Sequence, residues 1–192
     1  ETGKLSDLAA ERFHPDNKNT YRKLIREKLE IPESATLILF VGSGFERKGL
    51  QFLLESTAYL NNEDWRLLLM GKGKFEKFIR YAPTDKHPQI IAKEPDPEIE
   101  KYYAAADIFI LPSIYEPFGN ANLEALATGL PVITTRYCGA ADIIKNKQNG
   151  LVVQDPFNPE EIAENIRSLF DPSTRETMGK NARELAEQFP LE

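Results

Sequence analysis

Hydrophobic positions along the chain follow two alternating patterns. Short continuous apolar runs stop at glycine, proline or polar residues, which is typical of strands buried on both faces. Between them, apolar residues recur three and four positions apart, as in amphipathic helices. The runs predict strands at 36–41, 65–70, 89–92, 107–111, 131–135 and 150–153, and the spacing predicts helices near 21–28, 50–58, 99–106, 118–128, 162–170 and 178–189.

This alternation predicts an α/β fold with a Rossmann-like, doubly wound parallel sheet. We assign residues 35–172 to that domain, residues 1–34 to an N-terminal arm and helix, and residues 173–192 to a C-terminal helix. Residues 4–19 of the arm are polar and predict irregular structure. The helix that follows is predicted to place Tyr21, Leu24, Ile25 and Lys28 on one side.

Composition excludes several classes of protein. The 192 residues are 41% hydrophobic, which predicts a packed core, and their net charge of -6 argues against nucleic acid as a partner. No apolar run approaches the roughly 20 residues that insert into a membrane. The single cysteine excludes an internal disulfide, and the absence of a leader pattern predicts a cytoplasmic protein.

Candidate chemistry lies where predicted strands end, because ligands of such folds bind at the carboxyl edge of the sheet. The first strand is followed by Gly42, Ser43 and Gly44, which allow a close backbone approach, and then by Arg47 and Lys48. Two cations beside a helix start favour a phosphate site, and a solvated turn with two surface cations is the alternative.

The predicted helix after the fourth strand has a glutamate on each side of its start. Glu116 precedes the helix and Glu124 lies eight positions further on. Carboxylates accept hydrogen bonds from sugar hydroxyls, whereas the alternative makes both residues ordinary features of an amphipathic helix. Free amides in the segment Phe118-Gly119-Asn120-Ala121 suit an anion.

The remaining strand ends offer weaker candidates. Lys93, Glu94 and Pro95 begin a stiff loop that could flank a nucleobase, and Glu94 with Asp96 is the only spacing that resembles a metal site, so we predict no metal. Cys138 follows the fifth strand without a histidine nearby in our prediction, which favours a packing role over a nucleophile. A nicotinamide-dependent oxidoreductase is disfavoured because Gly71-Lys72-Gly73-Lys74 stands where an acid would bind ribose.

Together these residues resemble a known family. Glu116 and Glu124, within the phrases 104–107, 111–113, 116–119 and 129–132, match the Glu-x7-Glu signature of retaining glycosyltransferases with two Rossmann-like domains, the GT-B architecture. More narrowly, residues 12–15 and 40–49 are similar to lipopolysaccharide core glucosyltransferases. The resemblance covers most of residues 11–190 and implies that this chain is the C-terminal, donor-binding domain.

The resemblance implies a role for each matched residue. Arg47 and Lys48 hold the donor diphosphate, and Glu116 binds the transferred sugar together with the backbone near Phe118. Glu124 accepts hydrogen bonds from the ribose, and the loop at 93–95 lies along the base. We count Arg47, Lys48 and Glu116 as catalytic and the other matched residues as donor-binding.

The resemblance also implies a reaction and partners. The expected donor is a nucleotide sugar, UDP-glucose first and GDP-mannose or UDP-N-acetylglucosamine as alternatives, used without a metal or other cofactor. The expected acceptor is a lipopolysaccharide core or another glycan or glycolipid, bound by an N-terminal domain that precedes this chain. Alone, the chain is expected to bind nucleotide with little turnover, and the whole protein to be cytoplasmic or peripheral on the inner membrane face. A sugar-nucleotide-binding module without catalysis is the alternative.

Overall fold

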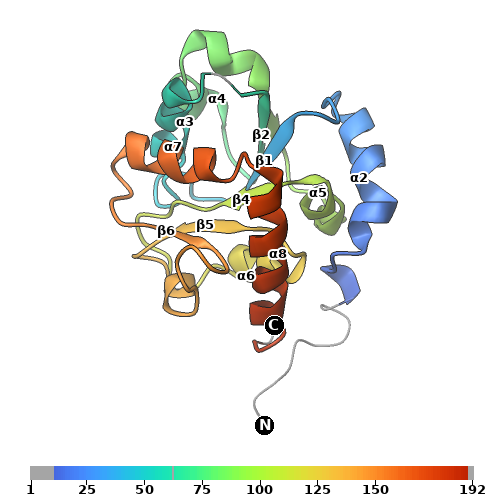
Figure 1. Cartoon of the computed structure of the whole chain (residues 1–192). Coiled ribbons are helices and arrows are strands. Elements are labelled where there is room, and N and C mark those ends of the chain that lie inside the picture. Colours follow the sequence, from blue (N-terminus) through green and yellow to red (C-terminus); the bar gives the residue numbers. More distant parts are fainter. Residues whose placement is uncertain (1–10, 62, 190–192) are drawn as a thin grey trace.

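The computed structural model describes residues 11–61 and 63–189, which form a six-stranded parallel sheet with helices on both faces (Figure 1). The strand order is β3-β2-β1-β4-β5-β6, so the winding direction reverses between β1 and β4. The prediction of a Rossmann-like, doubly wound sheet is therefore confirmed. The strands are β1 (Thr36–Val41), β2 (Trp65–Met70), β3 (Ile90–Lys93), β4 (Ile108–Ile110), β5 (Val132–Thr135) and β6 (Leu151–Val153).

Helices cover the sheet in two layers (Figure 1). The helices are α2 (Asn17–Lys28), α3 (Leu50–Ser56), α4 (Glu76–Ile79), α5 (Ile99–Ala105), α6 (Asn120–Ala127), α7 (Pro159–Ser168) and α8 (Pro172–Ala186). Helix α3 packs on α7, α2 on α5 and α6 on α8. Four short elements were not predicted separately: helix α4 and the 3-10 helices at Thr57–Tyr59, Thr84–Gln89 and Gly139–Asp142. Elements this short contain too few residues for a periodic pattern to be recognised.

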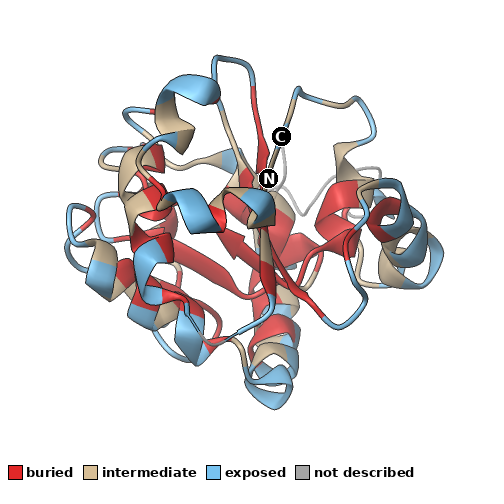
Figure 2. Cartoon of the chain, turned by 90° about the horizontal axis from the view of Figure 1, so that it is seen from above, coloured by how far each residue is buried: buried red, intermediate tan, exposed pale blue. Residues whose placement is uncertain are grey.

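The core lies where the sequence predicts it. The central strands β1, β2 and β4 are buried along nearly their whole length, while the helices expose their outer faces (Figure 2). Trp65 at the start of β2 is fully buried, and its indole N–H donates to the Leu60 carbonyl at 3.1 Å. Continuous apolar runs are the consequence of helices on both faces, which leave no strand face for water.

The N-terminal arm differs from its prediction. Helix α2 begins at Asn17, within the segment predicted to be irregular. Leu24 is 56% exposed, and Arg26 is buried in its place beside Ile25. Residues 1–10 of the arm and residues 190–192 of the predicted terminal helix lie outside the described residues.

Arg26 is buried because it joins α2 to the start of β4. Its guanidinium lies 2.6 Å from the carboxylate of Asp107, and that carboxylate also accepts from Arg22 at 2.9 Å and from the Leu37 amide at 2.8 Å. Burial alone would raise the pKa of Asp107, but the Arg22 charge, the Leu37 amide and the Arg26 charge outweigh it and hold that pKa below its usual value. The ion pairs therefore fasten the arm to the sheet at the amino ends of β1 and β4.

At the carboxyl ends of the same strands, the loops after β1 and β4 cross in close contact. The Ile114 amide donates to the Arg47 carbonyl at 2.8 Å. Gly49, at the start of α3, has φ 70°, and a Cβ atom there would lie 2.1 Å from the Pro112 carbonyl oxygen. Only glycine lets the two loops approach in this way.

We expect Gly49→Ala to lower the free energy of unfolding by at least about 2 kcal/mol, since the left-handed backbone and the clash with Pro112 act together. Gly44→Ala is the matched control, because Gly44 has φ 74° but open space around its Cβ position. It is expected to cost about 1 kcal/mol. Urea unfolding of both variants measures the difference, and equal losses would show that the crossing of the loops does not need glycine.

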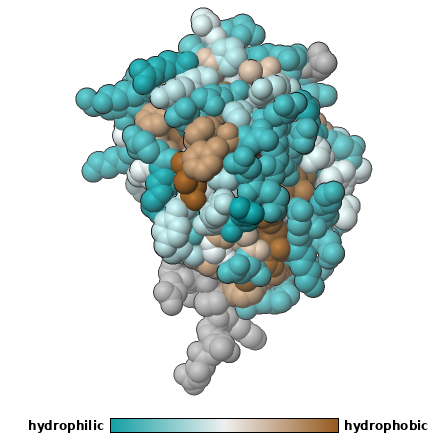
Figure 3. All heavy atoms as spheres, turned by 90° about the vertical axis from the view of Figure 1, so that its left-hand side faces the viewer, coloured by the Kyte–Doolittle hydropathy of each residue, from teal (hydrophilic) through white to brown (hydrophobic). Residues whose placement is uncertain are grey.

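The outer surface is mainly polar. The side of the molecule seen in Figure 3 is largely hydrophilic, with small apolar patches between polar side chains. Among the exposed aromatic residues, Phe157 packs edge to face on Phe52 with ring centroids 5.2 Å apart. Among the described residues, no helix is both long enough and apolar enough to cross a bilayer.

Candidate functional site

An ion-pair cluster stands at the carboxyl ends of β1 and β4. The Lys48 ammonium lies 2.7 Å from Oε2 of Glu116, and Arg47 Nη1 lies 3.4 Å from the same oxygen. The side chains of Lys48 and Glu116 are only 13% and 11% exposed, whereas that of Arg47 is 49% exposed. The structure thus brings together the three residues that we count as catalytic, although they come from separate loops.

The glycine-rich loop after β1 guides Lys48 to that carboxylate. A Cβ atom on Gly42 would lie 2.4 Å from Cδ of Lys48, so the lysine side chain runs directly over the Gly42 backbone. Ser43 and Gly44 are exposed at the loop tip, and the Ser43 hydroxyl accepts from the Lys72 amide at 2.9 Å. The small residues of this loop therefore leave room for a cation and for a ligand beside it.

A short parallel bridge fixes the backbone of Glu116. Its amide donates to the Tyr137 carbonyl at 3.2 Å, and its carbonyl accepts from the Gly139 amide at 2.9 Å. A Cβ atom on Gly139 would lie 1.8 Å from the Pro117 carbonyl oxygen. The segment after β5 therefore fixes the backbone at Glu116, which limits the positions that the Glu116 carboxylate can reach.

The start of α6 faces the same cluster through its backbone. Gly119 precedes the helix with φ 77°, and the amides of Phe118, Gly119, Asn120 and Ala121 have no hydrogen-bond acceptor among the described residues. Unpaired amides at the start of a helix attract anions, because the helix dipole adds to their partial charges. An anion between this helix start and Lys48 would meet positive potential from both sides.

Cys138 packs beneath this helix start. Its thiol donates to the Phe118 carbonyl at 3.1 Å and accepts from the Asn122 amide group at 3.3 Å. Burial raises the pKa of this thiol above its usual value, which disfavours the reactive thiolate. The packing role predicted for Cys138 is thus consistent with its surroundings.

Glu124 belongs to α6, and its carboxylate contacts α5 instead of the ion-pair cluster. Its carboxylate accepts from the Tyr103 hydroxyl at 2.8 Å, and Tyr103 is fully buried. Burial raises the pKa of Glu124 above its usual value, although the Tyr103 hydroxyl and the Arg12 charge oppose that rise. A half-buried carboxylate with one hydrogen bond keeps acceptor capacity for another donor.

The loop after β3 also stays separate from the ion-pair cluster. Glu94 and Pro95 are exposed, whereas the Lys93 ammonium lies 3.6 Å from Asp96 and over the ring of Tyr102. Asp96 accepts from the Tyr102 hydroxyl at 2.8 Å and from the Glu98 amide at 3.0 Å, so its oxygens are already engaged. Within residues 11–61 and 63–189, no three His, Cys, Asp or Glu side chains form a group that could hold a metal ion.

Comparison with known proteins settles the family. The family model described as glycosyl transferases group 1 matches residues 21–185. The chain belongs to this family. It is 32% identical over 191 residues to the lipopolysaccharide glucosyltransferase WaaG of Escherichia coli K12, and 33% identical over 178 residues to the D-inositol 3-phosphate glycosyltransferase of Corynebacterium kroppenstedtii.

Solved glycosyltransferase structures share the fold. The crystal structure of WaaG matches 91% of this chain with a TM-score of 0.74 at 31% identity, over 50% of its own length. The C-terminal domain of the glycosyl transferase group 1 protein LpcC of Francisella tularensis matches 92% of this chain with a TM-score of 0.77 at 25% identity, over 94% of its own length. This group 1 domain therefore has the architecture of the C-terminal domain of GT-B enzymes.

The chain spans half or less of the length of its curated relatives. Its match covers 93% of this chain but 50% of WaaG, and 85% of this chain but 39% of the inositol phosphate enzyme. These relatives are named for different substrates. Membership in the group 1 family thus defines the class of enzyme and leaves donor and acceptor to be inferred.

Two features of the site were not predicted from the sequence of this group 1 domain. The Tyr103 hydroxyl at Glu124 comes from a helix whose apolar spacing predicts only packing. The bridge from Glu116 to the segment after β5 joins positions 22 residues apart, and no local pattern marks it. Gly139 is the only signal that could have suggested a close approach there.

Proposed function

We propose that this chain is the donor-binding half of a retaining glycosyltransferase that transfers a hexose, with UDP-glucose as the first candidate donor. The proposed acceptor is a lipopolysaccharide core or a related glycan. The observation that carries the proposal is the Lys48–Glu116 ion pair of 2.7 Å beside the free amides at the start of α6. The relationship to WaaG, which is named a lipopolysaccharide glucosyltransferase, supports the choice of donor and acceptor.

In this proposal the donor diphosphate binds between two sources of positive potential. Arg47 and Lys48 supply charge from one side, and the amides from Phe118 to Ala121 supply it from the other. Glu116 accepts hydrogen bonds from hydroxyls of the transferred sugar. Glu124 accepts hydrogen bonds from the ribose hydroxyls, and the loop that contains Lys93, Glu94 and Pro95 lies along the base.

The chemistry follows from where negative charge grows. Cleavage of the bond between sugar and phosphate leaves a nucleoside diphosphate, whose new charge appears next to Lys48 and the start of α6. Cations and N–H groups that are already in position stabilise that charge without reorganisation, and removal of one such contact costs about 10²-fold in rate. We propose that these groups take the part that a divalent ion plays in other transferases, and that attack from the leaving-group side retains the anomeric configuration.

Acceptor binding is proposed to involve residues outside this chain, because the chain spans only 50% of WaaG. For the same reason we propose that the chain alone binds donor but transfers little sugar. Cytoplasmic action, peripheral to the inner membrane face, belongs to the same proposal. An assay of sugar transfer by the 192-residue chain tests it, and robust turnover would contradict this division of roles.

Nucleotide binding provides the direct test of the donor site. We expect UDP to bind more tightly than GDP or ADP in calorimetry and to raise the melting temperature, since a ligand that binds only the folded state stabilises it. At 100 times the dissociation constant the gain is about 2.7 kcal/mol. Preference for GDP would redirect the proposal to another donor, and no shift with any of the three at several millimolar would overturn it.

Glu124→Gln separates binding from stability. A raised pKa means that the folded state disfavours the ionised carboxylate, so its stability falls as pH rises from the usual glutamate range through that raised pKa. The variant is therefore expected to melt higher than the parent chain at pH 7 and equally at about pH 3.5. Because an amide accepts fewer hydrogen bonds, UDP binding is expected to weaken about tenfold. Glu164→Gln, at an exposed position of α7, is the control, and a lower melting temperature for Glu124→Gln at pH 7 would contradict the expectation.

A further inference from the structure

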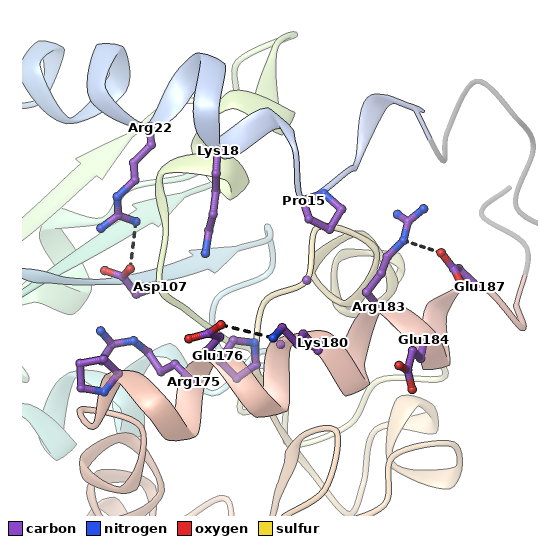
Figure 4. A pocket seen from close by; sticks show the side chains of 14 residues that line it. Pro15, Lys18, Arg22, Asp107, Arg175, Glu176, Lys180, Arg183, Glu184 and Glu187 are labelled. Carbon is purple, nitrogen blue, oxygen red and sulfur yellow. Dashed lines mark hydrogen bonds and ion pairs between the residues drawn. The ribbon is translucent and has the colours of Figure 1, made fainter.

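A cavity lined by charged side chains lies at the opposite ends of the strands from the donor site. It has a volume of about 630 Å³ and opens between α2, α8 and the end of α6 (Figure 4). Asp107 and Pro131, which line it, directly precede β4 and β5. The cavity is therefore at the amino ends of these strands, whereas Lys48 and Glu116 lie at the carboxyl ends.

The charges that line this cavity do not cancel. Five cationic side chains and four acidic ones face it, in a chain whose net charge is -6. Three cations have acidic partners within the cavity, as Arg22 pairs with Asp107 at 2.9 Å, Lys180 with Glu176 at 3.3 Å and Arg183 with Glu187 at 3.0 Å. The two cations that remain are Lys18 and Arg175, and the one acid that remains is Glu184, so the lining carries a net charge of +1.

Lys18 and Arg175 have no acidic group within ion-pair distance among residues 11–61 and 63–189. Lys18 reaches from α2 toward α8, as Figure 4 shows, and no hydrogen bond of its ammonium to those residues is found. Arg175 donates through one nitrogen, Nη1, to the carbonyls of Leu169 and Phe170, each at 2.8 Å, which leaves its other N–H groups available.

Lys18 is also held at a cost to the free protein. Burial lowers its pKa, and the charges of Arg22, Arg175 and Arg26 lower it further against the attraction of Asp107. A half-buried ammonium among three guanidinium groups destabilises the empty protein. A bound anion would relieve that repulsion.

We propose that this cavity binds a small phosphorylated molecule, whose phosphate lies between Lys18 and Arg175. Two neighbouring cations without an ion-pair partner offer a phosphate more contacts than a monocarboxylate could use, and lysine and arginine are the usual phosphate ligands. The volume falls within the range of about 300–1,000 Å³ typical of small-molecule sites. Because the ligand would touch both α2 and α8, it would join the arm helix to the last helix of the domain.

Inorganic pyrophosphate is a suitable probe, and NMR of the ¹⁵N-labelled chain can distinguish the two sites. Gly129 and Gly179 line the cavity, whereas Gly44 and Gly119 belong to the donor site. We expect the amides of Gly129 and Gly179 to shift with pyrophosphate and not with acetate at equal ionic strength. Lys48→Ala should leave these shifts unchanged even if it removes those at the donor site, so the two proposals can fail independently.

Lys18→Ala is the decisive variant. It should weaken the response of Gly129 and Gly179 about 10- to 100-fold, the effect of losing a hydrogen bond between charged groups. The fold should persist because the Lys18 ammonium has no hydrogen bond to lose among the described residues, and the ¹⁵N spectrum of the variant verifies this. Lys23→Ala, an 87% exposed lysine on the same helix, is the matched control and should bind as the parent chain does.

Two results would overturn the proposal. One is the absence of any change in the NMR shifts of the Gly129 and Gly179 amides at about 10 mM pyrophosphate, because a dissociation constant above that concentration corresponds to negligible affinity. The other is an equal shift in the parent chain and in Lys18→Ala. Vesicles that contain phosphatidic acid form a separate arm, since a lipid headgroup offers the same phosphate chemistry. If the parent chain sediments with these vesicles and Lys18→Ala does not, the phosphate belongs to a lipid headgroup. If the chain binds pyrophosphate but does not sediment with the vesicles, the ligand is a soluble phosphorylated molecule.

Discussion

Lys48→Ala is expected to weaken binding of UDP to this chain about 10- to 100-fold, measured by calorimetry. The ammonium of Lys48 is mostly buried and held 2.7 Å from Glu116, so it is already in place before a ligand arrives. In the proposed site it meets the diphosphate where water is partly excluded, which strengthens the contact. Removal of Lys48 also leaves Glu116 with Arg47 as its only ion-pair partner among the described residues, and this adds carboxylate repulsion against the phosphates.

The control for Lys48→Ala must remove a lysine without touching the site. Lys23→Ala does so on α2, where the side chain is 87% exposed and its contact with Glu27 is 3.8 Å. That variant is expected to bind UDP as the parent chain does, because such surface pairs contribute little. Equal affinity of the parent chain and of Lys48→Ala, with both folded, would remove Lys48 from the donor site.

Asp107→Asn is expected to lower the free energy of unfolding by about 3–5 kcal/mol at pH 7, because it leaves a buried cation without its counter-charge. Arg26 is 1% exposed and lies 2.6 Å from this carboxylate. Its other hydrogen bonds go to backbone carbonyls, which cannot replace a full negative charge. Such a loss is a large share of the stability of a domain of this size.

The pH dependence of this loss has a definite sign. The folded pKa of Asp107 lies below the usual value of about 3.9, so its carboxylate stabilises the fold at pH above that value. The contribution disappears as pH falls through the depressed folded pKa. The difference between the parent chain and Asp107→Asn in urea unfolding should therefore be constant from pH 5 to 8 and shrink below about pH 4.

Asp85→Asn is the matched control for this experiment. The Asp85 side chain is 74% exposed and lies 3.7 Å from the Lys86 ammonium. Exposed pairs contribute at most about 1 kcal/mol, so this variant should unfold nearly as the parent chain does. A loss below 1 kcal/mol for Asp107→Asn would show that α2 is not fastened to the sheet through this carboxylate.

Much of the fold could be predicted from local patterns. The runs at 36–41 and 65–70 coincide with β1 and β2, because strands covered on both faces have no polar side and stand out from their surroundings. The arm was harder to predict. Leu24 and Lys28 fit a helical stripe, but burial of Arg26 depends on Asp107, which is 81 residues away.

The sequence by itself determined the α/β class, the strand positions and the candidate residues at the strand ends, since each depends on neighbours within a few positions along the chain. Only the tertiary structure decided which of these residues meet. Lys48 and Glu116 are separated by 68 positions, and they touch because β1 and β4 are adjacent where the winding of the sheet reverses. The cavity around Lys18 and Arg175 depends in the same way on the packing of α2 and α8 around it, and no local pattern records such packing.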